Sequence, residues 1–238
     1  MRSSARFPAI ILGGCLIVAF GLLGYQLADG LITFKQMNRT VVAKGLAEKE
    51  VPADVAIWPI RFWEGANDLG TLVKDIQTKN DKIIVFLHDR GFTDQDISIN
   101  PPAITDNETL NYNTSQNKFR FTAESDVTVY TTNVNRVRQA RQEILELAAA
   151  GIAIASNDYE ARTEYLFTGL NTLKPAMIEE ATRNAREVGE KFAQDSDSRL
   201  GKIKSARQGV FQITDRDKNT PYIKKVRVIS TIEYYLTD

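Results

Sequence analysis

Few residues of this chain are of the types that carry out chemistry, and their spacing builds none of the common catalytic arrangements. The sequence has one cysteine, Cys15, and one histidine, His88. These numbers exclude a disulfide within the chain, a multi-cysteine zinc or iron–sulfur site, and a metal site built on two histidines. No phosphate-binding glycine loop and no serine-nucleophile motif occurs. We therefore expect a protein that is not an enzyme and that has no cofactor.

Three features imitate chemical sites but are more simply explained as local structure. The segment 215–219 resembles the start of a calcium loop, but Thr220 and Val226 stand where that loop needs glycine and glutamate. The acidic segment 91–96 is typical of a solvated turn. His88 lies near the end of a predicted helix, where the helix dipole favours a histidine. A carboxylate pair among the 30 acidic residues would still allow acid–base chemistry, so an enzyme remains a third hypothesis.

The charge balance also excludes a class of partner. The chain of 238 residues carries 30 basic and 30 acidic residues, so its formal net charge is zero. Nucleic-acid-binding proteins usually carry a strong basic excess, so we expect no nucleic-acid partner. Hydrophobic residues make up 43% and charged residues 25%, which is typical of a folded protein.

The N-terminal region predicts a membrane segment. Residues 7–28 contain no charged side chain. A helix of that length spans about 33 Å, enough for a hydrocarbon core of about 30 Å. We therefore expect a cytoplasmic tail at 1–6, a transmembrane signal anchor within 7–34 that contacts the lipid bilayer, and a stalk at 35–39. Because Arg2 and Arg6 precede the span, the N-terminus should stay in the cytoplasm. The remaining residues would then lie in the periplasm, tethered to the bacterial inner membrane by a single pass.

Two other fates of this segment stay open. A signal peptide would be cleaved, and a lipoprotein would be cleaved and acylated at Cys15, although the apolar run continues well beyond that residue. Small residues also recur along the span, and such a stripe allows helices to pack closely or simply reflects membrane composition. The possible helix-packing residues are Gly14, Gly21, Gly24 and Ala28.

Beyond the stalk, three amphipathic helices are predicted at about 67–88, at about 133–150, and from Lys174-Pro175 to about 192. Each has apolar residues at spacings of three and four. Each is followed by a glycine and then a short strand, and the glycines are Gly91, Gly151 and Gly201. The apolar stripe of the third helix is Met177 or Ile178, Ala181, Ala185, Val188 and Phe192.

The strands between these helices predict an α+β fold. We expect one mixed β-sheet with the helices on one face, forming a single domain over 40–238. The pattern at the C-terminus predicts a hairpin with a polar turn at 215–221. One face of its last strand should carry Val226, Val228, Ser230, Ile232 and Tyr234.

An aromatic-rich segment offers a candidate surface for self-association. Trp58, Phe62 and Trp63 lie within a predicted strand. They serve either as core residues, the commonest use of aromatic side chains, or as an oligomer-contact strand that pairs with a neighbouring subunit.

The part of the chain beyond residue 40 resembles the SIMPL-domain family of bacterial envelope proteins, which includes YggE-like and periplasmic immunogenic proteins. The resemblance rests on the segments 42–47, 51–56, 91–94, 97–98, 181–192, 200–203, 226–228 and 234–235. These segments are patterns of core residues and turns, so they imply the fold more strongly than any site. The resemblance brings no catalytic residue with it.

The family resemblance implies an exported or anchored envelope protein without a settled activity. It also implies ring-like homo-oligomers and an association with oxidative-stress tolerance in some members. We therefore expect a membrane-anchored, homo-oligomeric scaffold that takes part in cell-envelope maintenance. The alternative is a periplasmic module that binds or senses a small molecule in an apolar pocket.

Overall fold

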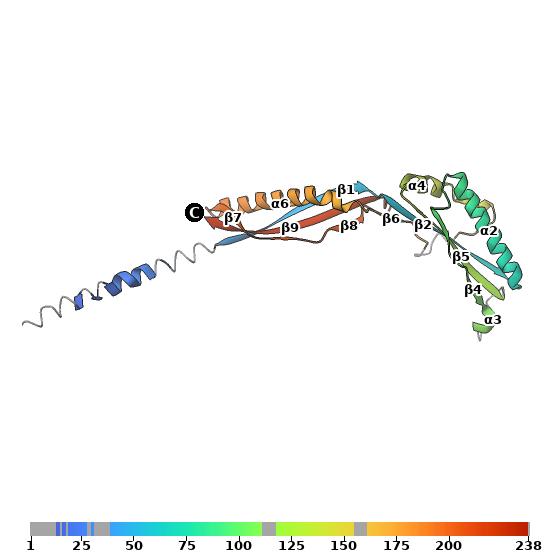
Figure 1. The fold of residues 1–238 in the computed structure, drawn as a ribbon, viewed down its shortest axis with the longest axis horizontal. Coiled ribbons are helices and arrows are strands. Elements are labelled where there is room, and N and C mark those ends of the chain that lie inside the picture. The colour runs from blue at the N-terminus through green and yellow to red at the C-terminus, as the bar shows by residue number, and fades with distance from the viewer. Residues whose placement is uncertain are drawn as a thin grey trace, which may run out of the picture. The chain divides into compact units, whose positions relative to one another are not determined.

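The computed structural model describes residues 13–14, 16–17, 19–27, 30, 39–110, 118–154 and 161–237 (Figure 1). The chain divides into two compact units, each built from separate stretches of sequence. Unit 1 comprises Met1–Glu48, Lys174–Phe211 and Arg227–Asp238, and unit 2 comprises Lys49–Leu173 and Gln212–Val226. The single domain expected over 40–238 therefore contains two such units.

The first sheet has the strand order β1-β9-β7, with β8 also paired to β9. Its strands are β1 (Thr40–Pro52), β7 (Arg199–Gln208), β8 (Gln212–Asp215) and β9 (Ile223–Thr237). Side chains alternate across a strand, so every second residue of β9 points to the same face. All five residues predicted for one face of β9 are buried: Val226, Val228, Ser230, Ile232 and Tyr234. The predicted strand and its inner face are thus confirmed.

In unit 1 the helix α6 (Leu170–Asp195) runs along this sheet (Figure 1). Its buried residues recur every four positions: Met177, Ala181, Ala185, Gly189 and Ala193. The prediction was correct as far as Ala185 and wrong beyond it, because Val188 and Phe192 are 37% and 54% exposed. A row of small residues at a spacing of four lets the helix backbone lie close to the sheet, and the larger side chains are left on the outer face.

Both ends of α6 differ from the prediction. Pro175 lies inside the helix, which already begins at Leu170. Asp54 accepts hydrogen bonds from the backbone N–H groups of Thr168 and Gly169, so the chain is fixed just before that point. The residue with positive φ after the helix is Asp197, at 50°, whereas Gly201 lies within β7.

The second sheet belongs to unit 2 and has the strand order β3-β5-β2-β6, with β4 also paired to β5. Its strands are β2 (Val55–Ala66), β3 (Ile97–Ile99), β4 (Ala103–Asp106), β5 (Phe121–Thr131) and β6 (Glu164–Leu166). Each pairing is antiparallel. The α+β class is confirmed, but the single mixed sheet is wrong, since the strands form two antiparallel sheets.

The helices of unit 2 cover one face of this sheet. They are α2 (Leu69–Asp89), α4 (Val134–Gln142) and α5 (Leu145–Ala149), and a short helix α3 (Asn107–Leu110) follows β4. Leu72, Ile76, Ile83 and Leu87 of α2 are fully or almost fully buried against β2 and β5 in the unit 2 core. The predicted helix at 67–88 is therefore confirmed.

The glycines expected after the first two helices are confirmed as well. Gly91 and Gly151 have φ of 80° and 87°, a conformation that residues with a Cβ rarely adopt. The segment expected as one helix at 133–150 is instead two helices. The break comes at Glu143, whose N–H bonds to the carbonyl of Ala140, three residues earlier.

The predicted membrane segment, 7–34, is described for half of its length. Its described residues include the stretch 19–27, which is helical and exposed throughout. Within the described residues, no helix has both the length and the hydropathy needed to cross a bilayer. Residues 1–12, 28–29 and 31–38, with Cys15 and Ala28 of the predictions above, lie outside the described residues.

Candidate functional site

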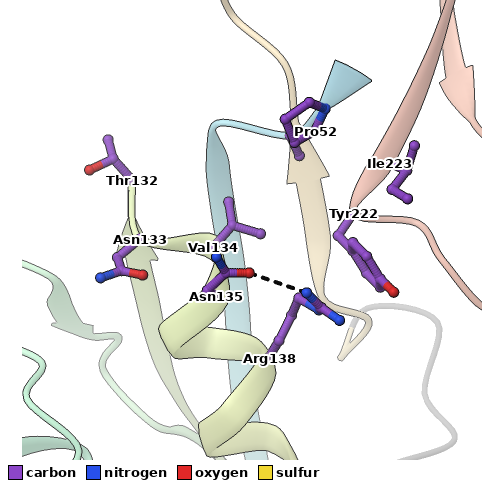
Figure 2. A pocket seen from close by; sticks show the side chains of 9 residues that line it. Pro52, Thr132, Asn133, Val134, Asn135, Arg138, Tyr222 and Ile223 are labelled. Atoms are coloured by element: carbon purple, nitrogen blue, oxygen red, sulfur yellow. Dashed lines mark hydrogen bonds between the residues drawn. The ribbon is translucent and has the colours of Figure 1, made fainter. Parts of the chain in front are cut away.

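A cleft of about 580 Å³ lies in unit 2, beside the start of α4 (Figure 2). We call it the Arg138 cleft. Its lining residues come from the end of β1, the start of α4 and the segment that leads into β9, and they are Pro52, Ala53, Thr132, Asn133, Val134, Asn135, Arg138, Tyr222 and Ile223.

Local hydrogen bonds fix the α4 side of the cleft. Strand β5 ends at Thr131, whose hydroxyl accepts a hydrogen bond from the N–H of Asn133 at 3.2 Å. The side chain of Asn133 then accepts one from the N–H of Arg136 at 3.1 Å, as an N-cap residue does. Asn135 and Arg138 follow three residues apart, so they lie on the same face of the helix.

Arg138 is held from two directions. Its guanidinium carbon lies 3.6 Å from the centre of the Tyr222 ring, in a cation–π contact. Its Nη1 donates a hydrogen bond to Oδ1 of Asn135 at 3.2 Å, drawn as the dashed line in Figure 2. Because both contacts restrain the long side chain, the guanidinium is presented to the cleft in a defined orientation.

Tyr222 is itself anchored. Its carbonyl oxygen accepts a hydrogen bond from the N–H of Ala53 at 2.8 Å. Its ring packs edge-on against Tyr165, with the ring centres 6.1 Å apart. Tyr165 in turn accepts a hydrogen bond at 3.3 Å from Arg141, which lies three residues after Arg138. Two arginines of α4 therefore contact one pair of tyrosines.

The cleft has a positive charge that its own lining does not neutralise. None of the nine lining residues is acidic. Among the described residues, no carboxylate pairs with Arg138 in a salt bridge. Arg90, directly after α2, is by contrast paired with Glu143 at 2.8 Å and Glu146 at 2.6 Å. Together with the apolar residues Val134 and Ile223, this guanidinium makes the cleft suited to binding an anion that also has an apolar part.

A second surface feature lies in unit 1, where β1 forms an edge of its sheet. Only β9 pairs with it in the sheet formed by the described strands. The carbonyl of Arg39 accepts from the N–H of Leu236 in β9 at 2.8 Å. Backbone groups of an antiparallel strand point alternately to its two sides, so the even-numbered residues of β1 point away from β9. We call that side the open edge of β1, and Asn184 of α6 reaches it at the carbonyl of Leu46, at 2.7 Å.

The profile of the SIMPL family, described as a protein of unknown function (DUF541), matches residues 41–227. The chain belongs to the SIMPL family. No curated protein matches the chain. The family match confirms the resemblance inferred from the core and turn patterns. The matched residues include strands of both sheets and end at Arg227, within the first third of β9.

The structure separates the three aromatic residues proposed as an oligomer-contact strand. Trp58 and Phe62 are 2% and 0% exposed and belong to the unit 2 core, so they offer a partner no surface. Trp63 is 50% exposed. The cause is strand alternation, because the even-numbered residues of β2 face the helices and Trp63 faces the opposite side.

The predicted helix-packing glycines are described in part. Gly14, Gly21 and Gly24 are helical, and a Cβ added to any of them would meet no atom within 4 Å. Their partner in the predicted stripe, Ala28, lies outside the described residues.

The segments that imitated chemical sites are turns in this SIMPL protein. Asp217 Oδ1 accepts from the N–H groups of Asn219 and Thr220, both at 2.8 Å. Hydrogen bonds from the Thr220 hydroxyl and from Arg216 hold the pKa of Asp217 well below its usual range. Within the described part of the chain, no cluster of three metal-ligating side chains occurs. His88 lies in the last turn of α2, as the sequence predicted, and its Nε2 is 3.0 Å from Oδ1 of Asp94.

Sequence reasoning missed the Arg138 cleft. The sequence singled out neither residue: Arg138 lies within the helix predicted at 133–150, and Tyr222 comes directly after the turn predicted at 215–221. The order of residues contains no motif that brings the two together, because their contact depends on the path of the chain into β9. The one available signal was Asn133, a good N-cap residue directly after a strand, which marks the start of α4.

Proposed function

We propose that this SIMPL protein is anchored in the bacterial inner membrane and acts in the periplasm as a homo-oligomeric, non-enzymatic scaffold. Its process would be cell-envelope maintenance or stress tolerance. The proposal has two parts, membrane attachment and self-association, and each is supported by different residues.

Membrane attachment is supported by the uncharged residues 7–28, preceded by Arg2 and Arg6. In the described part of this segment the large apolar side chains are exposed around the helix. Ile17, Phe20 and Tyr25, for example, are 75%, 70% and 72% exposed. A helix that is apolar on all sides is expected to be buried in lipid or protein, which favours an anchor.

Self-association is supported most strongly by the open edge of β1. The strand is 13 residues long, about twice the usual length. A long edge strand is a template for pairing with another chain unless it is covered. Membrane attachment would also hold copies of the chain in one plane, which raises their local concentration.

The role of the open edge of β1 in self-association can be tested with a proline substitution. At an exposed position of the strand, proline removes one backbone N–H and leaves the buried side chains in place. Lys44 is exposed and even-numbered, so its N–H points to the open edge and not to β9. We expect detergent-solubilised full-length protein to have the mass of a discrete oligomer, and Lys44→Pro to reduce that mass. Lys44→Ala, which keeps the N–H, should leave the mass unchanged.

The outcomes separate the two parts of the proposal. A wild-type monomer would refute the scaffold, and an oligomer that persists in a folded Lys44→Pro variant would refute the role of this edge. Membrane attachment is measured separately, by fractionation of expressing cells followed by a carbonate wash. Recovery of the protein in the soluble fraction would refute the anchor.

A second function, a small-molecule binding module, is favoured by the Arg138 cleft. Its volume of about 580 Å³ falls within the range of small-molecule sites, about 300–1,000 Å³. Its restrained guanidinium supplies a polar group of defined direction.

A further inference from the structure

We propose that the Arg138 cleft binds a small organic carboxylate with an apolar or aromatic body. All nine lining residues belong to unit 2. The inference is therefore independent of the scaffold proposal, which rests on unit 1 and the N-terminal segment, and it names the ligand class for the binding-module alternative.

The charge of Arg138 is the first argument. Two other partly buried arginines of unit 2 have acidic partners: Arg61 lies 2.8 Å from Glu124, and Arg90 lies 2.8 Å from Glu143. Arg138 is also partly buried, yet its hydrogen bond goes to the neutral Asn135 and its flat face lies on Tyr222. A partly desolvated cation that has no carboxylate partner among the described residues favours an anionic ligand, because the interaction is screened less than at a free surface.

The geometry of the guanidinium is the second argument. A planar fork of N–H donors matches a carboxylate, which accepts two parallel hydrogen bonds. One face and the Nη1 of Arg138 are already engaged within the protein. These contacts fix the plane in which the remaining donors lie, so a ligand carboxylate would meet a restrained partner and lose less conformational entropy in binding.

The apolar part of the lining is the third argument, and it narrows the ligand class. Pro52, Val134 and Ile223 lie around the same cleft as Arg138 (Figure 2). An inorganic anion would satisfy the charge but leave these side chains in contact with water. An organic carboxylate satisfies both, since its body covers the apolar residues while its charged group meets the guanidinium.

The test compares two probes of equal shape in detergent-solubilised full-length protein. Benzoate carries the carboxylate, and benzamide is its neutral counterpart. We expect benzoate to raise the melting temperature in a saturable manner, with an affinity at least tenfold higher than that of benzamide. Inorganic phosphate at the same ionic strength should produce a smaller rise. A rise as large with phosphate would overturn the assignment of an organic ligand.

Variants show whether Arg138 is responsible. Arg138→Gln should remove the benzoate effect, and Arg138→Lys should weaken it at least tenfold, because an ammonium group has no planar fork. Arg183→Gln makes the same chemical change on the exposed face of α6 in unit 1 and should bind benzoate like the wild type. If Arg138→Gln does not fold, the benzoate affinity of Arg138→Lys shows whether Arg138 is responsible.

Three further results would overturn the proposal: no saturable effect of benzoate, equal affinity for benzamide, or unchanged binding in the folded Arg138 variants. The mass of each sample, measured in parallel, keeps the two proposals separate. Benzoate binding by a monomer would support the cleft proposal and refute the scaffold proposal. An oligomer that does not bind benzoate would support the scaffold proposal and refute the cleft proposal.

Discussion

Gly45 of β1 lies directly against the backbone of Ala181 in α6. A Cβ built on Gly45 would stand 1.8 Å from the carbonyl oxygen of Ala181 and 2.3 Å from the backbone nitrogen of Ala185. Real Cβ atoms do not approach a backbone so closely, and backbone atoms cannot rotate away as a side chain can. The absence of a side chain at this position therefore allows α6 to pack on the first sheet.

We predict that Gly45→Ala strongly destabilises unit 1. The helix would have to move away from the strand by more than an ångström, which would separate the close contacts along the row of small residues. Overpacking of this kind costs about 1–3 kcal/mol, and a clash with backbone places this site at or above the upper end. Chemical denaturation followed by circular dichroism measures the change in the free energy of unfolding.

Gly70→Ala is the matched control. A Cβ there would meet only the flexible end of Asp68, at 3.3 Å, and the residue lies in the first turn of α2. Alanine is favoured over glycine in helices by up to about 1 kcal/mol, so this variant should be as stable as the wild type or more stable. Equal stability of Gly45→Ala and the wild type would mean that β1 and α6 are not packed as described.

Substitution of Tyr234, in contrast to that of Gly45, is predicted to leave the protein as stable or to stabilise it. The side chain of Tyr234 is 1% exposed within the unit 1 core, and no polar atom of the described residues forms a hydrogen bond with its Oη. A buried hydroxyl without a partner costs about 1–3 kcal/mol. We therefore expect Tyr234→Phe to raise the free energy of unfolding or leave it unchanged, as measured by denaturant titration.

Tyr165→Phe provides the comparison for that variant. Tyr165 is 3% exposed and its hydroxyl accepts a hydrogen bond from Arg141 at 3.3 Å. Removing this hydroxyl should lower the free energy of unfolding by about 0.5–1.5 kcal/mol. A loss of stability in Tyr234→Phe as large as that in Tyr165→Phe would show that the Tyr234 hydroxyl is satisfied in the native protein.

Asp54, in the connection between β1 and β2, holds the segment before α6 by hydrogen bonds. Its carboxylate accepts hydrogen bonds from the N–H of Thr168 at 2.8 Å, the hydroxyl of Thr168 at 3.0 Å and the N–H of Gly169 at 3.0 Å. We expect Asp54→Ala to lower the free energy of unfolding by about 1–2 kcal/mol, as loss of a helix cap does. Asp54→Asn, which keeps one acceptor oxygen, should lose less, and an equal loss in both would point to the charge instead of the hydrogen bonds.

The elements that the sequence predicted well are those governed by local periodicity. The helix α2 and the buried face of β9 follow from apolar residues that repeat at the period of a helix or a strand. Gly91 and Gly151 were identified because ending a helix with positive φ is a local requirement. Asp197 was missed because hydrogen bonds from the N–H groups of Asp197 and Ser198 to the last turn of α6 hold the chain there without a glycine.

The features that the sequence did not predict depend on contacts between distant segments. Periodicity tells which face of a strand is buried but not which strand lies beside it, so the pairing of β1 with β9 and the two antiparallel sheets could not be read from it. The same holds for the meeting of Arg138 with Tyr222. In α6 the period predicted the stripe correctly until its packing against β1 selected the residues four apart.

Asp96 leads to a prediction about pH. Burial raises the pKa of Asp96, but hydrogen bonds from the N–H of Thr93 at 3.0 Å and its hydroxyl at 2.8 Å, with help from Thr131 and Arg136, bring the pKa below its ordinary value of 3.8. A carboxylate with a lowered pKa in the folded state contributes stability that is complete above its unfolded-state pKa, about 3.9. That stability is lost as the pH falls through the folded-state pKa.

We therefore expect Asp96→Asn to be less stable than the wild type at pH 6 and to lose less stability between pH 5 and pH 2.5. Melting temperatures across this range measure both effects. Asp94→Asn is the control, because it removes the same charge two residues away, where the side chain is 91% exposed. It also removes the contact with His88, but an exposed pair of this kind contributes little to stability. Its melting curve should follow that of the wild type at every pH. If Asp96→Asn and Asp94→Asn behaved alike, the hydrogen bonds from Thr93 would not stabilise the folded state, since the two variants differ chiefly in those contacts.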